Sequence, residues 1–150
     1  MRRPINLASL LLAASFLIAC EIPVPEKSPI AGTAPASRLT EAQLENGIGP
    51  IAGFDLPSLN SALASEGEKS FNLKCASCHQ WDSRLVGPPL NGVTERRAPA
   101  FIMNIMLNPD ELGKKHPEMI KLREEYGVPM PNQFLSRDEA RAILEYMRGK

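Results

Sequence analysis

The chain lacks a net charge, because its 150 residues carry 17 basic and 17 acidic side chains. Proteins that bind nucleic acids usually show a strong basic excess, so the balanced charge argues against that class. Only 3 cysteines are present, an odd number that is too small for a disulfide framework. The sequence also lacks an apolar run of about 20 residues, the length that a membrane-spanning helix needs. A chain of this length supports one ordinary domain with room for a tail.

The first 20 residues have the features of a bacterial export signal. A pair of arginines precedes a run of 12 uncharged, mostly apolar residues at positions 7–18, which matches the apolar region of a signal peptide better than a membrane span. The run ends in Leu17-Ile18-Ala19-Cys20, which resembles the lipobox of bacterial lipoproteins. The resemblance implies that residues 1–19 are removed as a signal peptide and that the sulfur of Cys20 carries a lipid. An ordinary secretory signal with an incidental cysteine is the alternative.

Residues 20–60 differ in composition from the rest of the chain. Six prolines and four glycines occur between residues 21 and 60, with few large apolar side chains. Such a stretch buries too little surface to offset its chain entropy, so a flexible, lipid-anchored linker is predicted, with only a transient helical turn at Leu39–Asn46. The expected location is the periplasm or the outer face of the cytoplasmic membrane, with the lipid as membrane anchor.

Residues 61–150 hold nearly all of the periodic hydrophobicity, and the period is helical. Start and stop signals predict four helices in this order: residues 63–74, residues 99–107 ahead of Asn108-Pro109, residues 117–127, and a last helix that begins with a capping box of Ser136 and Glu139. No strand pattern of comparable strength is present. The predicted domain is therefore all-α, with about four helices.

The sequence Cys75-Ala76-Ser77-Cys78-His79 directly follows the first predicted helix. This C-x-x-C-H spacing is typical of c-type haem attachment, in which two cysteines bind one porphyrin edge and the histidine faces the iron. A thioredoxin-like redox pair would need a βαβ setting, and a zinc site would need four ligands, of which only His116 is available beyond the motif. One covalently attached haem c is therefore the predicted cofactor, with Trp81 packed near it.

With these motifs, residues 61–150 resemble a class I monohaem cytochrome c. Gly67 and Phe71 lie eight and four residues before the first motif cysteine, as in the first helix of that family. Ile143 and Tyr146 resemble the matching pair on its C-terminal helix. The resemblance implies a fold in which the N- and C-terminal helices cross, with the glycine allowing a close approach, around one haem. With few aromatic residues, the domain is expected to need its haem to fold.

A second part of the resemblance concerns the surroundings of the haem. The sequence Gly87-Pro88-Pro89-Leu90-Asn91-Gly92 resembles the G-P-x-L-x-G loop of the family, in which the proline carbonyl accepts a hydrogen bond from the proximal histidine. By this match Pro88 would hold His79 and fix its tautomer. Arg96 resembles the arginine near a haem propionate, with the adjacent Arg97 as the alternative.

The sixth iron ligand is predicted to be Met130. Pro129 and Pro131 restrict the backbone on both sides of it, and the family carries its axial methionine in such a loop. His116 is a second candidate, but its charged neighbours predict an exposed side chain. The remaining methionines lie at helical positions with apolar neighbours, where core packing is predicted: Met103, Met106, Met119 and Met147.

Histidine and methionine ligation leaves no open position for a substrate, so the predicted function is one-electron transfer rather than catalysis. The expected protein is a monomeric, membrane-tethered carrier between a quinol-oxidising complex and a terminal reductase or oxidase. The alternatives are a peroxidase-like haem enzyme, of which the known bacterial examples carry two haem motifs, and a gas sensor, in which the motif lies near the chain end. Short segments at residues 92–97, 102–104, 108–109 and 130–133 also resemble small cytochromes associated with nitrous oxide reduction, which would imply a copper reductase as acceptor.

Overall fold

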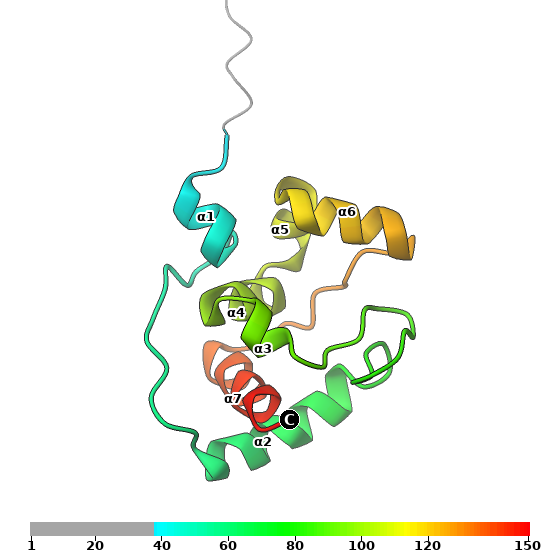
Figure 1. Ribbon diagram of the computed structural model, residues 1–150. Helices are drawn as coiled ribbons and strands as arrows, with labels where there is room; N and C mark the ends of the chain where they lie inside the picture. The colour runs from blue at the N-terminus through cyan, green and yellow to red at the C-terminus, as the bar shows by residue number, and fades with distance from the viewer. Residues whose placement is uncertain (1–37) are drawn as a thin grey trace, which may run out of the picture. The chain divides into compact units, whose positions relative to one another are not determined.

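The computed structural model describes residues 38–150, and this part of the chain contains seven helices and no strand (Figure 1). The helices are α1 (Glu41–Asn46), α2 (Ser61–Lys74), α3 (Val93–Arg96), α4 (Pro99–Leu107), α5 (Pro109–Lys115), α6 (Pro117–Tyr126) and α7 (Arg137–Arg148). The all-α prediction is confirmed. The predicted signal peptide, the predicted lipid site Cys20 and the linker as far as residue 37 lie outside the described residues. No helix within residues 38–150 is long and apolar enough to cross a membrane.

Helices α2 and α7 cross and form the base of the domain (Figure 1). A Cβ atom at Gly67 would lie 1.9 Å from the carbonyl oxygen of Ala142, so only glycine allows the two backbones to approach this closely. Phe71 packs against Tyr146 with ring centroids 5.4 Å apart, and Ile143 is buried beside them. The crossing of the terminal helices that the family resemblance implied is therefore present.

The helix starts follow the predicted signals, and the three additional helices are short. The capping box at the start of α7 forms both of its hydrogen bonds. The Asn108-Pro109 pair ends α4 as predicted, but it also begins α5. Proline suits this first helical position because its missing N–H group would have no partner inside the helix. Helices of four to seven residues, such as α3 and α5, are too short to show a hydrophobic period.

Residues 38–60 form a strap along the domain, so the prediction of a flexible linker as far as residue 60 is wrong for this part. A capping box starts its helix α1. Asn104, which is fully buried on α4, holds the strap through three hydrogen bonds. Its Nδ2 atom donates to the carbonyl oxygens of Asn46 (2.7 Å) and Ile51 (2.8 Å), and its Oδ1 atom accepts from the Ile51 amide (3.0 Å).

The other two buried polar side chains of the described residues also bond to the strap. His116 is only 4% exposed, and its Nε2 atom donates to the carbonyl oxygen of Leu44 at 3.1 Å. The prediction that His116 is exposed is therefore wrong. Glu145 is fully buried and accepts a hydrogen bond of 2.6 Å from the Asn60 amide. Backbone groups that leave water need partners, and these side chains supply them to a segment that has little regular secondary structure.

Candidate functional site

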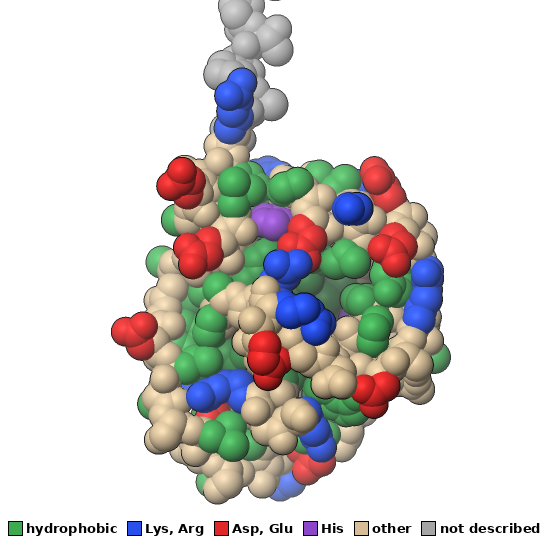
Figure 2. All heavy atoms as spheres, viewed as in Figure 1, with side chains coloured by type: hydrophobic (Ala, Val, Ile, Leu, Met, Phe, Trp, Pro, Cys, Tyr) green, Lys and Arg blue, Asp and Glu red, His purple; other side chains and the backbone are tan. Residues whose placement is uncertain are grey.

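A cavity of about 500 Å³ lies between the haem-motif segment and helices α4, α6 and α7. Figure 2 shows this face of the molecule hollowed between hydrophobic side chains. The volume is in the range of small-molecule and cofactor sites. All six residues predicted to bind the cofactor or its iron line it: Cys75, Cys78, His79, Pro88, Arg96 and Met130. His116, the second candidate for the sixth ligand, is not among the lining residues and lies under the strap instead.

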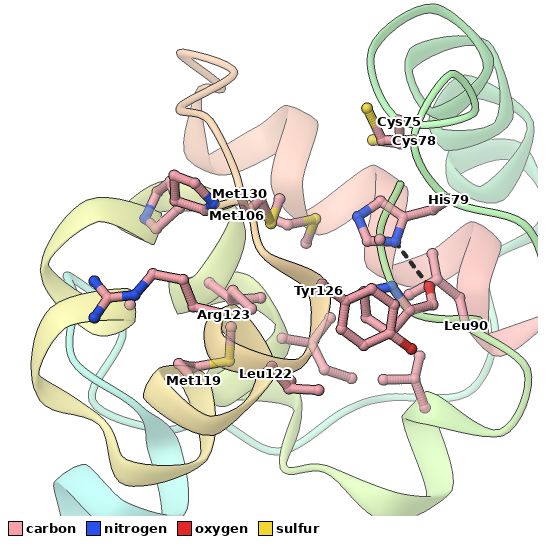
Figure 3. Close-up of a pocket in the computed structure, with 18 of the residues that line it drawn as sticks. Cys75, Cys78, His79, Leu90, Met106, Met119, Leu122, Arg123, Tyr126 and Met130 are labelled. Carbon is pink, nitrogen blue, oxygen red and sulfur yellow. Dashed lines mark hydrogen bonds between the residues drawn. The ribbon is translucent and has the colours of Figure 1, made fainter. Parts of the chain in front are cut away.

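The ring of His79 is held in one orientation by the loop that follows it. Its Nδ1 atom lies 2.9 Å from the carbonyl oxygen of Pro88 (Figure 3). Because a carbonyl oxygen only accepts, Nδ1 carries the proton and Nε2 keeps a free lone pair for a metal ion. A Cβ atom at Gly87 would lie 2.5 Å from Cε1 of the same ring. Glycine is therefore required at this position, and the hydrogen bond implied by the family loop is present.

Met130 lies on the side of the cavity opposite His79, and Figure 3 shows its side chain directed toward that ring. It belongs to the irregular segment between α6 and α7 and is half-buried. Met106 of α4 lies beside it in the same view. Met106 is 5% exposed and belongs to the core, as predicted, but it also lines the cavity, which its helical spacing alone did not indicate.

The two motif cysteines lie on a single turn at the end of α2, with their sulfur atoms on the same side of the cavity (Figure 3). The amides of Cys78 and His79 donate to the carbonyl oxygen of Cys75 at 3.0 and 2.9 Å. Burial raises the pKa of the Cys75 thiol from 9.0 to about 11, although Lys74 acts in the opposite direction. Before haem is attached, the thiol is therefore protonated at neutral pH, unlike the low-pKa cysteines of thiol enzymes.

These donors fit a haem group better than a metal ion bound by side chains alone. Residues 38–150 contain no group of three or more His, Cys, Asp or Glu side chains that could hold a metal ion, which disfavours the zinc alternative. An imidazole nitrogen and a thioether sulfur lie on opposite walls of an apolar cavity, and two thiols lie at one edge. This is the donor set of a covalently bound haem with histidine and methionine ligands.

Both candidate arginines line the cavity, but they have different partners. The Nη1 atom of Arg96 donates to the carbonyl oxygen of Asn91 at 2.7 Å. Arg97 forms an ion pair with Glu118 of α6, and its guanidinium carbon lies 5.5 Å from the centroid of the Phe101 ring. Arg96 is thus tied to the loop that holds the histidine, and Arg97 is tied to the opposite wall.

Two aromatic residues differ from the sequence-based expectation. Trp81 stacks on Phe71 with centroids 5.2 Å apart and an interplanar angle of 15°, and it is not among the lining residues. Its link to the cavity is therefore through Phe71, which does line it. Tyr126 lines the cavity as the last residue of α6 and was not predicted. Two features of the sequence could have indicated this position. Tyr126 directly precedes Gly127, which ends the helix with a φ of 76°, and it lies four residues before Met130.

Comparisons with known proteins find similarity to cytochromes c. The family model for cytochrome c matches residues 64–149. Cytochrome c-551 of Stutzerimonas stutzeri is 28% identical over 95 residues, which cover 60% of this chain and 82% of that protein. A solved structure of cytochrome c from Rhodothermus marinus is 46% identical with a TM-score of 0.69, covering 72% of this chain and 94% of that one. An engineered form of the same cytochrome, bound to a carbene intermediate, is also 46% identical, with a TM-score of 0.66 and coverage of 72% and 95%.

The matched region spans more than half of the chain and contains the haem motif, helix α7 and most of helix α2. Members of this family bind covalently attached haem c and transfer electrons. The chain belongs to the cytochrome c family, as a class I monohaem c-type cytochrome.

Proposed function

We propose that this cytochrome is a membrane-tethered one-electron carrier that accepts electrons from a quinol-oxidising complex and passes them to a terminal reductase or oxidase. In this proposal Cys75 and Cys78 would attach the haem covalently, and His79 and Met130 would bind its iron. The observation that carries the proposal is that His79 and Met130 lie on opposite walls of one cavity (Figure 3). When bound, haem supplies a centre that gains and loses a single electron. With both of these ligands supplied by the protein, no position on the iron would remain open for a substrate.

The residues around the cavity suit electron transfer because they keep the donor atoms in place. The hydrogen bond from His79 to Pro88 and the close contact with Gly87 prevent the imidazole from rotating. A ligand that keeps one position in both oxidation states needs little rearrangement when an electron arrives. The walls are largely apolar, and the soft sulfur of Met130 would favour the reduced iron.

Replacement of Met130 by alanine tests this assignment. The ferric wild-type protein should show the sulfur-to-iron charge-transfer band, and Met130→Ala should lose the band and have a lower reduction potential. Met119→Ala is the matched control, because Met119 also lines the cavity, and it should keep the band. If the wild-type protein lacks the band and binds carbon monoxide rapidly when reduced, the carrier proposal is wrong. A haem enzyme or gas sensor with an open sixth position would then be favoured.

The proposed tether begins at a lipid on Cys20, and this part of the proposal is supported by the lipobox-like sequence at residues 17–20. The described domain already begins at residue 38. Eighteen residues of chain can span at most about 60 Å, so the cytochrome would remain close to the membrane surface. Mass spectrometry of the N-terminal peptide should show a lipidated Cys20. The Cys20→Ser protein should move from the membrane fraction to the periplasmic fraction, and an unchanged distribution would contradict the lipid anchor.

Nitrous oxide reductase is the specific acceptor that we propose. Support comes from the short segments that resemble cytochromes associated with nitrous oxide reduction. All four of them, residues 92–97, 102–104, 108–109 and 130–133, contribute lining residues to the cavity. The reduced cytochrome should transfer electrons to a nitrous oxide reductase faster than an unrelated cytochrome c of similar potential does. Equal rates would contradict this acceptor without affecting the carrier function.

A further inference from the structure

The segment that carries Met130 has few bonds of its own to the rest of the domain. We call residues 127–131 the Met130 loop. Pro129 and Pro131 have no N–H group, and within residues 38–150 the only hydrogen bond at residues 128–131 is a local one of 3.4 Å from the side chain of Gln133 to the Pro131 carbonyl. Helix α6, from which the loop emerges, packs mainly against α5. Segments with so few hydrogen bonds to the rest of the domain open at low free-energy cost.

The wall that carries His79 is held much more firmly. The loop after the haem motif is pinned at its base by backbone hydrogen bonds, from the Leu90 amide to the Gln80 carbonyl (2.9 Å) and from the Gly87 amide to the Cys78 carbonyl (2.8 Å). Arg84 lies at the exposed tip of this loop. The two walls thus differ in how strongly they are attached to the domain.

Arg84 bridges the two walls. Its Nη2 atom donates a hydrogen bond of 3.0 Å to the carbonyl oxygen of Glu125, and its guanidinium carbon lies 4.1 Å from the centroid of the Tyr126 ring. The Glu125 carbonyl belongs to the last turn of α6, where carbonyl groups lack partners inside the helix and attract cations. An arginine above a tyrosine ring adds a cation–π interaction. Both contacts act on the residues that immediately precede the Met130 loop.

We propose that Arg84 is a positioning residue for Met130, and that its contacts with Glu125 and Tyr126 latch the Met130 loop to the wall that carries His79. Only three residues separate Tyr126 from Met130, and one of them is a proline, so a movement of the ring is passed on to the methionine. Figure 3 shows the Tyr126 ring directed into the same cavity as the Met130 side chain. Without the latch, the Met130 sulfur leaves its position more often. The inference rests on the proposed assignment of Met130 as an axial ligand.

The other polar contact of α6 lies at its opposite end. Arg97 pairs with Glu118, the second residue of the helix, so it holds the start of α6. Arg84 holds the end that leads into the Met130 loop. Loss of the Arg84 contacts should therefore affect the loop while the start of α6 stays attached to the domain.

The test measures how fast imidazole displaces the Met130 sulfur in the ferric holoprotein. At saturating imidazole this rate reports the departure of the sulfur, and the decay of the sulfur-to-iron charge-transfer band follows it. Arg84→Ala and Tyr126→Leu should each accelerate displacement about tenfold, equivalent to about 1.4 kcal/mol. Tyr126→Phe keeps the ring and should remain within about twofold of the wild type, while Arg84→Lys keeps the charge without the planar fork and should be intermediate.

Lys121→Ala is the matched control, because it removes a positive charge from the exposed surface of the same helix. It should leave the displacement rate unchanged, and the thermal midpoints of all variants should stay close to that of the wild type. The double variant of Arg84→Ala and Tyr126→Leu should be little faster than either single variant, because both remove the same latch.

Two results would overturn the proposal, and they can be told apart. If the wild-type protein shows the charge-transfer band but Arg84→Ala displaces the sulfur within twofold of the wild-type rate, the latch is wrong and the assignment of Met130 stands. The latch is also wrong if Lys121→Ala is accelerated as strongly as Arg84→Ala. If the wild-type protein has no such band before imidazole is added, the assignment of Met130 is wrong, and the latch falls with it.

Discussion

Replacement of Asn104 by alanine removes the side chain that attaches the strap, residues 38–60, to helix α4. The change deletes three hydrogen bonds, two donated to the carbonyls of Asn46 and Ile51 and one accepted from the Ile51 amide. Asn104 is fully buried, and the strap backbone lies so close that a Cβ atom at Gly49 would be 2.3 Å from its Oδ1 atom. We expect the strap to detach at least locally, because its backbone groups can recover partners only in water.

The magnitude follows from these contacts. Each hydrogen bond contributes a net of roughly 1 kcal/mol, so the direct loss is about 3 kcal/mol. Detachment of the strap would also expose Ile48, which is 8% exposed in the folded protein, at a further cost of about 1.5–3 kcal/mol. We therefore expect Asn104→Ala to lower the free energy of unfolding by about 4.5–6 kcal/mol. For a domain of this size that is a decrease in Tm on the order of 20 °C.

Denaturant unfolding of the holoprotein, followed by circular dichroism, measures the loss of stability. Hydrogen exchange should show faster exchange of the Ile51 amide, and of the strap generally, with little change in the core of α7. Asn72→Ala is a suitable control, because Asn72 is exposed on α2 and should change stability by less than about 0.5 kcal/mol. A loss below about 1 kcal/mol for Asn104→Ala, with unchanged exchange at Ile51, would refute the view that the strap is an integral part of the domain.

Two further changes probe the helix crossing and the buried carboxylate. Gly67→Ala would place a Cβ atom 1.9 Å from the Ala142 carbonyl oxygen, so the two helices must move apart. We expect denaturant unfolding to show a decrease in the free energy of unfolding of about 3 kcal/mol or more. A decrease below about 1 kcal/mol would contradict the close approach of the helices. Burial raises the pKa of Glu145, but a hydrogen bond from the Asn60 amide and ion pairs with two arginines of α7 lower it more, so the folded pKa lies below 4.5. A lowered pKa stabilises the fold at pH values above 4.5, and this contribution is lost as the pH falls through 4.5 toward the folded pKa. Glu145→Gln should therefore lower stability by about 3 kcal/mol at neutral pH. It should also flatten the dependence of the unfolding free energy on pH below about 5, and an unchanged pH slope would show that Glu145 is not its source.

The features that were predicted from the sequence are those that depend on contacts between residues close together along the chain. The haem motif at residues 75–79, the capping box of α7 and the loop glycine Gly87 each act through contacts inside a single turn or loop. The strap was not predicted, because the amino-acid composition of a segment carries no information about the distant residues that it contacts in the folded domain. Its partners lie far away in sequence, with a separation of 53 positions between Ile51 and Asn104 along the chain. His116 was predicted to be exposed for the same reason, since its charged neighbours do not reveal that Leu44 covers it.

The same distinction explains why one wall of the haem cavity was predicted more completely than the other. The wall that carries His79 is built from a continuous stretch of sequence, and the bond to Pro88 spans nine positions. The opposite wall depends on the bridge from Arg84 to Tyr126, whose residues are about 40 positions apart. Because the first wall is pinned by its own backbone and the second by a side chain at the surface, exchange of an axial ligand should begin at Met130. Substitutions on the Met130 side should therefore affect the rate of ligand exchange more than the stability of the fold. Substitutions at Gly87 should affect the stability of the fold more than the rate of ligand exchange.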